Sequence, residues 1–485
     1  MNFKPPLRFL GRLLLVLAAA ELLPVVCCLA YGEQRAALAF VGTAFLTAVS
    51  GLVLMRAGRG DGEIYRREGI LIVVGGWVLA SVFGALPYLL TGTVHHPADA
   101  LFEAASGFTT TGASILTDIE SSGRGVLFWR SFTQWLGGMG IIVLFVALLP
   151  ELGAGTRFLY KLEVPGPTAE TLHPRVHDTA AVLWRLYLIL TVVQTLLLML
   201  AGLDLYDALT HTFSTLSTGG FSPRNTSVAA FDSPLVEVII IVFMVIAGVN
   251  FSLYYGLRKR GGWRQVWADS EFRIYLALIA LFSLAITWNL MAAGDYGERG
   301  AGRALLDSTF QVVGVLTTTG FATADFDAWP NTSRLLMVAI MFFGGCAGST
   351  AGGMKIMRLV IGLKAAVREV RSIFSPSTVI SVFVGGKAVP NTVVRSVVGF
   401  FILYFAIWAG GVLALTLGDT DLQTSATASI ATLGNIGPGL NLVGPTANFA
   451  FFAPWQKLVM VLLMWLGRLE VYAIAALFTV AFWRR

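Results

Sequence analysis

The segment TTTGAS at residues 109–114 is polar and uncharged, yet it interrupts a chain of 485 residues that is 56% hydrophobic and 13% charged. Apolar runs of about twenty residues, the length that crosses the hydrocarbon core of a bilayer, recur along the sequence. They predict an all-α, polytopic membrane protein. Because lipid offers no hydrogen-bond partners to irregular backbone, TTTGAS must be buried in protein or line a water-filled cavity.

Three other segments align with TTTGAS: STGGFS at residues 217–222, TTTGFA at 317–322 and GNIGPG at 434–439. The alignment places four glycines at one position: Gly112, Gly220, Gly320 and Gly437. Each segment follows a half-polar stretch too short to span a membrane, at 99–108, 206–216, 303–316 and 422–433. One such segment alone is typical of a packing contact between helices, whereas four in register indicate an internal repeat.

The repeat defines the predicted domain organisation. Residues 1–62 form an N-terminal pair of transmembrane helices, with apolar runs at 9–31 and 36–55. The first run is interpreted as a retained helix because it lacks a small-residue cleavage site. Four units follow at 63–155, 156–265, 266–375 and 376–485. Each contains a long helix, a short helix with its polar segment, and a second long helix.

Basic residues predict the orientation. Lys and Arg cluster at residues 4–12, 56–67, 157–185, 258–273, 355–395 and 484–485. The positive-inside rule makes these segments, and both chain termini, cytoplasmic. The short helix and polar segment of every unit must then enter the membrane from outside and return. Four re-entrant segments in one chain predict a pseudo-fourfold arrangement around a single pore.

The chemistry of the polar segments suits a dehydrated monovalent cation. Backbone carbonyls supply converging oxygens without charge, glycine allows the φ values that turn them inward, and hydroxyls tether the backbone or add a ligand. None of the four segments carries the carboxylates that a Ca²⁺ or Mg²⁺ site would use. The predicted selectivity filter consists of Thr110, Thr111, Gly112, Thr218, Gly219, Gly220, Thr318, Thr319, Gly320, Asn435, Ile436 and Gly437.

A candidate gate interrupts the second long helix of the third unit. The sequence GGCAGSTAGGMK at residues 344–355 cannot form a firm helix, since each glycine costs roughly 1 kcal/mol relative to alanine. We expect this loop midway across the membrane, below the filter, although a kinked helix packed against a neighbour is an alternative. The gate residues are Gly344, Gly345, Cys346, Ala347, Gly348, Ser349, Thr350, Ala351, Gly352, Gly353 and Lys355.

Arg468 is the other candidate gate residue. The segment WLGRLE at 465–470 aligns with WLGGMG at 135–140, so Arg468 and Glu470 replace Gly138 and Gly140. Ionisable residues at membrane depth usually face a cavity or a partner. One interpretation pairs Arg468 with Glu470 or with loop carbonyls as a structural link. The other has its charge face the pore and repel cations until the loop moves.

The ordered segments SGFTTTGAS, FSTLSTGGFS, LTTTGFAT and ATLGNIGPGL, with GGCAGSTAGGMK between the last two, resemble the Trk/Ktr/HKT superfamily of potassium transporters. The resemblance covers nearly the whole chain. It implies M1-P-M2 repeats similar to those of potassium channels, a homodimer with one pore per subunit, and a bacterial inner-membrane location. It also implies a cytoplasmic regulatory ring of TrkA type. The nucleotides NAD(H), ATP or ADP are expected to bind to that ring and not to this chain.

The same resemblance implies the permeant ion. In the superfamily, glycine at the key filter position of every repeat goes with K⁺, whereas serine in the first repeat goes with Na⁺ in some members. All four positions are glycine here, which favours K⁺ held by backbone carbonyls, with Rb⁺ as a tolerated analogue. In the family, the loop matching residues 344–355 restricts the permeation path, and the resemblance supports a pore-facing Arg468.

Other classes of function are less consistent with the sequence. No histidine lies near Ser349 to make it a nucleophile, and GGMK is not a Walker A motif, so no enzyme is predicted. The five histidines share no metal-ligand spacing, and topology explains the net charge of +6 without nucleic acid. A symporter coupled to H⁺ or Na⁺ and a less selective K⁺/Na⁺ transporter stay open. The basic segments 151–177, 258–273 and 364–390 are expected to dock the regulatory partner, or to act as topology signals or lipid contacts.

Overall fold

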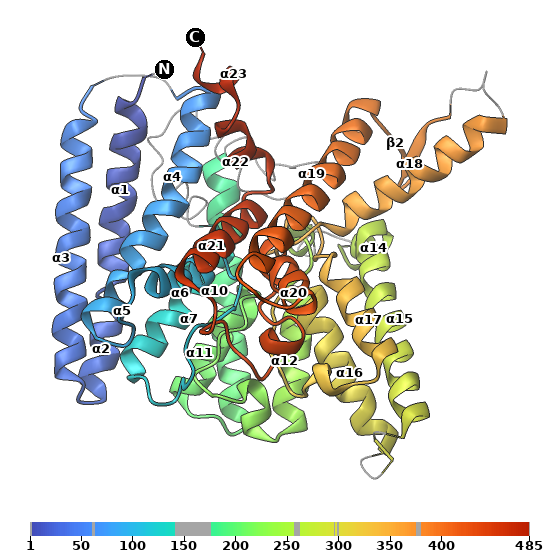
Figure 1. Ribbon diagram of the computed structural model, residues 1–485, viewed down its shortest axis with the longest axis horizontal. Helices are drawn as coiled ribbons and strands as arrows, with labels where there is room; N and C mark the ends of the chain where they lie inside the picture. Colours follow the sequence, from blue (N-terminus) through green and yellow to red (C-terminus); the bar gives the residue numbers. More distant parts are fainter. Residues whose placement is uncertain are drawn as a thin grey trace.

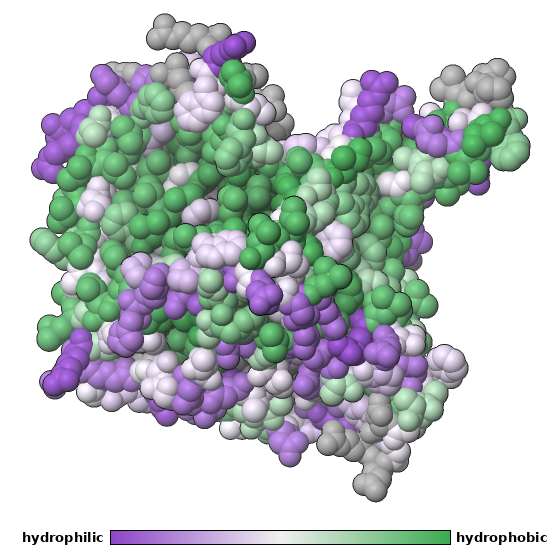
Figure 2. Space-filling model, viewed as in Figure 1, coloured by the Kyte–Doolittle hydropathy of each residue, from purple (hydrophilic) through white to green (hydrophobic). Residues whose placement is uncertain are grey.

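The structure, a computed structural model, describes residues 2–60, 64–140, 176–256, 262–294, 296, 297, 300–374 and 380–484, and is almost entirely helical there. Six helical segments in these ranges are long and apolar enough to cross a membrane: Lys4–Ala30, Gln34–Ala57, Arg67–Leu90, Ala180–Leu200, Ser270–Ala293 and Asn391–Thr416. Figure 2 shows a broad hydrophobic belt on the face in view, bordered by hydrophilic atoms along the bottom and at the upper left. The chain is therefore a multi-pass membrane protein.

A helical hairpin begins the chain, at the left of Figure 1. It comprises α1 (Lys4–Ala20), α2 (Leu23–Ala30) and α3 (Gln34–Ala57). Helices α1 and α3 approach closely at two glycines, because a Cβ on Gly11 would lie 2.5 Å from the carbonyl oxygen of Gly51. The buried Glu21, at the break between α1 and α2, accepts the hydroxyl of Thr47 at 3.0 Å. Helix contacts and one satisfied polar pair thus hold this hairpin together.

Four units follow the hairpin, each with a long helix, a shorter helix that precedes the polar segment, and a further helix after that segment. The first has α4 (Arg66–Gly84), α5 (Leu86–Leu90), α6 (Pro97–Phe108) and α7 (Arg124–Gly138), and the second has α10 (Val176–Leu200), α11 (Leu205–Leu216) and α12 (Pro234–Ala247). The third has α15 (Ser270–Ala293), α16 (Gly300–Leu316), α17 (Asn331–Met341) and α18 (Ile356–Phe374), and the fourth has α19 (Asn391–Thr416), α20 (Leu422–Leu433) and α21 (Pro454–Arg468). The helices α6, α11, α16 and α20 confirm that the stretches before the four polar segments are helical. The predicted borders at 62–63, 155–156 and 375–376 lie outside the described residues.

Smaller elements complete the fold. They are α13 (Phe251–Gly256), α14 (Gly262–Ala268), α22 (Tyr472–Leu477), α23 (Val480–Trp483), and the 3₁₀ helices η2 (Ser227–Phe231), η3 (Phe326–Ala328) and η4 (Asn441–Val443). Strands β1 (Val382–Val384) and β2 (Lys387–Val389) form an antiparallel hairpin beside the projecting α18, at the upper right of Figure 1. Gly385 and Gly386 have positive φ of 56° and 77°, which a two-residue hairpin turn requires.

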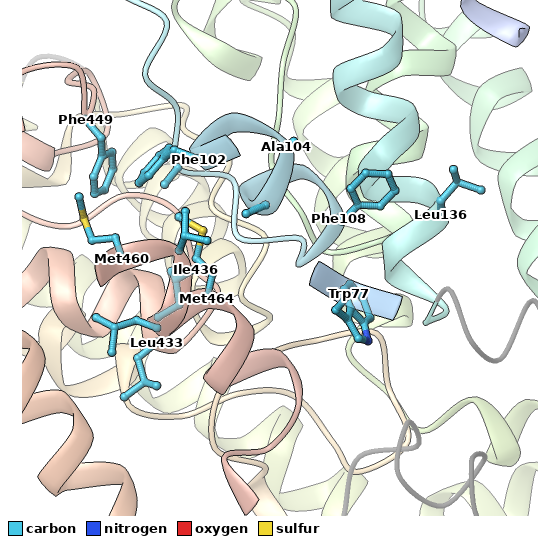
Figure 3. Packing of buried hydrophobic residues seen from close by; sticks show 14 of the residues in the cluster. Trp77, Phe102, Ala104, Phe108, Leu136, Leu433, Ile436, Phe449, Met460 and Met464 are labelled. Atoms are coloured by element: carbon cyan, nitrogen blue, oxygen red, sulfur yellow. The ribbon is translucent and has the colours of Figure 1, made fainter. Parts of the chain in front are cut away.

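An apolar core joins the first and fourth units. Figure 3 shows Phe102 of α6 beside Phe449, with ring centroids 5.6 Å apart, and Met460 of α21 nearby. At the end of α6, Phe108 meets Trp129 of α7 edge to face at 6.1 Å. Because such pairs bury large apolar areas, they fix α6 between α7 and α21.

Two glycines seat the long helices against the ends of the short ones. A Cβ on Gly137 of α7 would lie 1.8 Å from the carbonyl oxygen of Phe108, and one on Gly467 of α21 would lie 1.9 Å from that of Leu433. Phe108 and Leu433 are the last residues of α6 and α20, so the first and fourth units use the same contact. This contact fixes the depth at which the polar segments begin.

We expect Gly137→Ala to destabilise the protein by about 1–3 kcal/mol, because the added methyl group would overlap the Phe108 carbonyl. Gly410→Ala in α19 is the control, since an added Cβ there meets nothing within 4 Å and alanine favours helix by roughly 1 kcal/mol. Thermal unfolding of the detergent-solubilised protein measures both. Equal unfolding temperatures for the two variants would contradict the packing argument.

Candidate ion-conduction site

Each polar segment begins with the same turn directly after its short helix. The second residue of the segment is left-handed in every unit, with φ of 57° at Thr110, 56° at Thr218, 57° at Thr318 and 54° at Asn435. The next N–H returns to the helix, as from Thr111 to the Ser106 carbonyl at 2.9 Å, and the three equivalent bonds measure 2.8, 2.7 and 2.8 Å. This is the Schellman helix end, which usually employs glycine. A β-branched residue with positive φ is uncommon, so its recurrence marks a shared and demanding geometry.

A second left-handed residue follows two positions later, at the aligned glycines. Their φ values are 82° at Gly112, 78° at Gly220, 78° at Gly320 and 102° at Gly437, and the residue before each has no positive φ. Alternation of left- and right-handed residues turns consecutive carbonyls toward one side of a strand. That is the arrangement found in carbonyl-lined ion filters.

The four glycines lie in a closed ring. A Cβ on Gly112 would lie 2.2 Å from the carbonyl oxygen of Gly219 in the second unit. A Cβ on Gly220 would lie 1.8 Å from the carbonyl oxygen of Thr319, and a Cβ on Gly320 would lie 2.1 Å from that of Ile436. A Cβ on Gly437 would lie 3.0 Å from the carbonyl oxygen of Thr111, back in the first unit. Each unit therefore touches the next and the fourth touches the first. The twelve residues predicted for the filter all lie in or beside this ring, and a side chain at the glycines would strike a neighbouring carbonyl.

A cavity opens on one side of the ring. All four aligned glycines line it, together with loop residues that include Thr117, Ile119 and Asn225. Between these loops, the amide of Asn225 donates to the carboxylate of Asp118 at 2.9 Å and holds the pKa of Asp118 below its usual range. Asp118 is therefore ionised at neutral pH. The charged residues that line the cavity itself are Arg130 and Arg224, which form ion pairs with Glu103 and Asp207.

The predicted gate loop lies against the ring. Helix α17 ends before it and α18 begins after it, so residues 342–355 form an open loop and the alternative of a kinked helix is excluded. The N–H of Cys346 donates to the carbonyl of Gly248 at the end of α12 (2.8 Å), and the N–H of Gly352 donates to the hydroxyl of Thr318 (2.7 Å). The buried ammonium of Lys355 donates to the carbonyl of Ala351 within the loop. The loop is thereby bonded both to the second unit and to the polar segment of its own unit.

Arg468, the last residue of α21, joins three units. Its Nη1 donates to the Thr350 carbonyl of the loop at 2.9 Å, and its Nη2 donates to the carbonyls of Gly137 (2.5 Å) and Gly138 (3.0 Å). Its Nη1 also lies 3.3 Å from the hydroxyl oxygen of Thr110. The structure therefore supports the interpretation in which Arg468 binds loop carbonyls.

The alternative pairing of Arg468 with Glu470 is wrong. Glu470 instead forms an ion pair with Arg358 of α18. Both Arg468 and Glu470 line a second cavity, together with loop residues that include Gly348, Ser349, Gly352, Gly353 and Lys355. The loop and the Arg468 side chain thus stand between this cavity and the ring.

Comparisons with known proteins agree with this geometry. The TrkH family model, described as a cation transport protein, matches residues 36–483. The chain belongs to the TrkH family. It is 38% identical to the Trk system potassium uptake protein TrkH of Salmonella typhimurium, over the full length of both chains. It is 36% identical to TrkG of Escherichia coli K12, over 98% of this chain and 97% of that one.

The same relationship appears in three dimensions. The crystal structure of the potassium transporter TrkH from Vibrio parahaemolyticus matches with a TM-score of 0.89 and 36% identity, covering both chains completely. The fold described above is therefore that of the TrkH family. Membership of the family makes this chain a cation transport protein and not an enzyme.

Sequence reasoning missed a glutamine that supports the ring of this TrkH-family chain. Gln134 of α7 donates through Nε2 to the carbonyl of Gly219 (2.7 Å) and accepts through Oε1 from the N–H of Phe221 (3.0 Å). A Cβ on Gly219 would lie 2.4 Å from the Gln134 Cδ, so the amide fills the space a side chain would take. The equivalent positions of the other units are Met244, Met341 and Met464. The signal available in the sequence was that a polar residue occupies this position in the first unit, whereas the other three units have methionine there.

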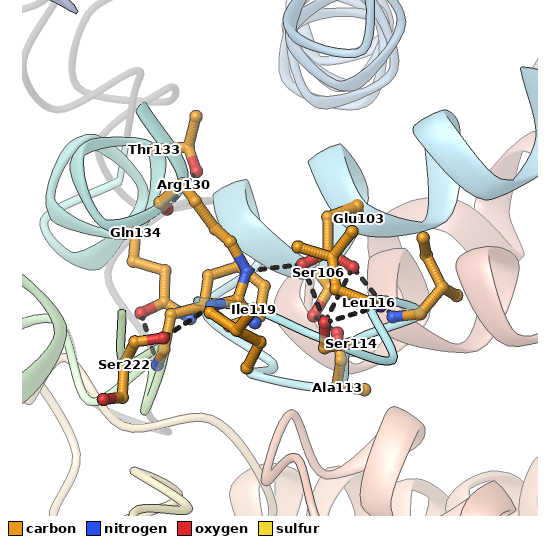
Figure 4. Close-up of polar contacts among 12 residues, drawn as sticks. Glu103, Ser106, Ala113, Ser114, Leu116, Ile119, Arg130, Thr133, Gln134 and Ser222 are labelled. Atoms are coloured by element: carbon orange, nitrogen blue, oxygen red, sulfur yellow. Dashed lines mark hydrogen bonds and ion pairs between the residues drawn. The ribbon is translucent and has the colours of Figure 1, made fainter. Parts of the chain in front are cut away.

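A buried ion pair supports the first segment and was not predicted either. Glu103 of α6 and Arg130 of α7 form an ion pair at 2.5 Å, and a dashed line marks this pair in Figure 4. Glu103 also accepts from the Ser114 hydroxyl (3.0 Å) and the Ile115 N–H (2.9 Å), while Arg130 donates to the Ser222 carbonyl (2.9 Å). The pair therefore binds the far ends of the first and second segments to the same point.

Glu271 secures the base of the gate loop. This buried residue near the start of α15 accepts, through one carboxylate oxygen, from the N–H groups of Ala347 and Met357, both at 2.9 Å. One group thus links the first half of the loop to the start of α18. A single acid at the start of a helix gives no sign of such a role in the sequence, because it is also typical of a helix cap.

We expect Gln134→Met to destabilise the protein by about 1–3 kcal/mol, since it leaves the Gly219 carbonyl and the Phe221 N–H without their buried partner. Met244→Leu, at the equivalent position of the second unit, conserves volume and should cost less than about 1.5 kcal/mol. Thermal unfolding of both variants measures the difference. An unchanged unfolding temperature for Gln134→Met would show that the two hydrogen bonds of the Gln134 amide contribute nothing to stability.

Proposed function

We propose that this chain is the ion-conducting subunit of a bacterial potassium-uptake system. K⁺ passes through the ring of four polar segments, and the loop at 344–355 together with Arg468 restricts its passage. The observation that carries the proposal is the closed ring of four glycines, each packed against a carbonyl of the next unit. The names of the relatives support the choice of ion, because TrkH and TrkG are each called a potassium uptake protein.

Selectivity arises from carbonyls that replace the hydration shell of K⁺. The carbonyls of the twelve filter residues serve as ligands, and their number and spacing set the preference among alkali cations. Glycine at the ring position keeps that spacing, because a side chain there would displace the carbonyl of the neighbouring unit. Rb⁺, as the closest analogue, is expected to follow the same path.

The closed gate works by obstruction and by charge. The loop obstructs the space between the ring and the second cavity, and Arg468 places a permanent positive charge there. Two unit charges about 4 Å apart repel by about 4 kcal/mol at an effective dielectric constant of 20. A repulsion of that size would reduce cation flux by about a thousandfold, so movement of the loop with Arg468 is the step that permits flow.

Assembly and location complete the proposal. The chain forms a homodimer with one pore per subunit in the bacterial inner membrane, with both termini in the cytoplasm. A cytoplasmic TrkA-type ring that binds NAD(H), ATP or ADP releases the gate, and the words "Trk system" in the relatives' names support an assembly of several components. The ring docks on the basic segments 151–177, 258–273 and 364–390. Parts of all three segments lie outside the described residues.

In proteoliposomes, we expect K⁺ and Rb⁺ flux to exceed Na⁺ and Li⁺ flux. Gly112→Ser should lower the K⁺/Na⁺ flux ratio by about tenfold, the effect of about 1.4 kcal/mol in relative ion binding, because the added side chain meets the Gly219 carbonyl. Gly410→Ala, which faces open space, is the control. Wild-type protein that conducts Na⁺ as well as K⁺, with no change in the serine variant, would overturn the filter assignment.

Arg468→Ala should raise K⁺ flux through the chain reconstituted alone, because it removes the charge from the gate and the bond to the Thr350 carbonyl. The measurement is initial Rb⁺ uptake at equal protein content. Unchanged uptake would refute the barrier role of Arg468 without affecting the filter. A steep dependence of uptake on an opposing Na⁺ or H⁺ gradient would instead favour a coupled symporter.

A further inference from the structure

The gate makes direct contact with two of the four equivalent left-handed residues at the second position of the polar segments. These positions are Thr110, Thr218, Thr318 and Asn435. The Thr318 hydroxyl oxygen accepts from the N–H of the loop residue Gly352 at 2.7 Å. The Thr110 hydroxyl oxygen lies 3.3 Å from Nη1 of Arg468. One contact involves the loop and the other involves Arg468, so both parts of the gate reach the end of the ring that faces them.

Thr218, the equivalent residue of the second unit, differs from Thr110 and Thr318 in its contact with the gate. The hydroxyls of Thr110 and Thr218 each donate to the carbonyl of the residue before, at 2.7 and 2.6 Å, so their internal geometry is the same. Within the ranges that the structure describes, Thr218 makes no hydrogen bond to the loop or to Arg468. Thr218 therefore serves as an internal control for Thr110, because the two hydroxyls have the same local geometry but only that of Thr110 contacts the gate.

Hydroxyl oxygens at this end of a carbonyl-lined strand are suitable ligands for a dehydrated cation. An N–H directed at such an oxygen places positive partial charge where a cation would bind, and a guanidinium places a full charge there. The contacts of Gly352 and Arg468 therefore oppose cation binding at Thr318 and Thr110. At the fourth position, Asn435 Oδ1 is buried without a hydrogen-bond partner among the described residues, and an added Cβ on Gly352 would lie 3.2 Å from it. An oxygen without a donor is thus present beside the loop.

We propose that the closed gate and a monovalent cation at the inner end of the filter compete for the hydroxyl oxygens of Thr110 and Thr318. The inference rests on the proposed function, since it assumes that the ring is the filter. Thr110 and Thr318 are then residues that couple the gate to the filter. Because coupling between two binding events is reciprocal, a cation at the inner site favours the open loop to the same extent that the closed loop weakens the site.

The test measures how strongly the gate restricts each variant. Rb⁺ uptake into proteoliposomes is compared for Thr110→Val, Thr318→Val and Thr218→Val, each with Arg468 intact and combined with Arg468→Ala. The ratio of the uptake with Arg468→Ala to the uptake with Arg468 intact reports the part of the gate's restriction that depends on Arg468, which also holds the loop through Thr350. Thr218→Val is the matched control, because it removes a hydroxyl of the same set and shares any loss of conduction that follows.

We expect Thr218→Val to scale both uptakes together and to keep the wild-type ratio. Thr110→Val and Thr318→Val should reduce the increase in uptake that Arg468→Ala causes by about fivefold. This is the effect of losing one ordinary hydrogen bond from the closed gate. Thr110→Ser and Thr318→Ser retain the oxygen and should restore the wild-type ratio, which separates the lost contact from a general folding defect. Raising internal K⁺ should increase uptake in wild type more than in the two valine variants.

Ratios for Thr110→Val and Thr318→Val that equal the ratio for Thr218→Val would overturn the coupling. This result would leave the pore intact if Gly112→Ser still lowers the K⁺/Na⁺ ratio. If Gly112→Ser leaves that ratio unchanged, the proposed function fails instead. The two failures are therefore distinguished by different variants and different measurements.

Discussion

The contact between each aligned glycine of the ring and the carbonyl of the next unit is the constraint on which the rest of the structure depends. It requires four strands of irregular backbone to meet at membrane depth, where lipid satisfies none of their polar groups. Short helices that enter and end at a common level meet this requirement, because each supplies the Schellman turn that starts its strand. Gly137 and Gly467 then fix the depth of two of these helix ends.

The four units share this geometry but differ in how they are supported. The first and second segments are held by Gln134 and by the pair of Glu103 with Arg130. The fourth segment is joined to the first by Asn435, whose amide donates to the Thr111 hydroxyl at 2.9 Å. Buried polar groups of this kind stabilise a structure when they are well paired and are costly when they are not. The supports therefore specify one arrangement of the ring, although the chain repeats are only approximate.

The loop at residues 342–355 and the ring form one connected hydrogen-bonded system. Glu271 accepts from the loop residue Ala347 and from Met357 just after the loop, Arg468 donates to Thr350, and Gly352 donates to a hydroxyl of the third segment. A movement of the loop would therefore break several connected bonds together. The mixed role of Arg468, which binds carbonyls of two units and also supplies positive charge, follows from its position at the end of α21.

The sequence by itself determined the features that depend on local pattern. The four short helices, the ring position of Gly112 and its equivalents, and the interruption before α18 were all predictable, because glycine content, polarity and length act within a few residues. The tertiary structure alone decided the partners of individual side chains. Arg468 binds the Gly137 carbonyl 331 positions away, and Glu470 pairs with Arg358 and not with Arg468. The physical reason is that a buried charge takes whichever partner the fold brings within hydrogen-bond distance, and that distance depends on how helices far apart in the chain pack together.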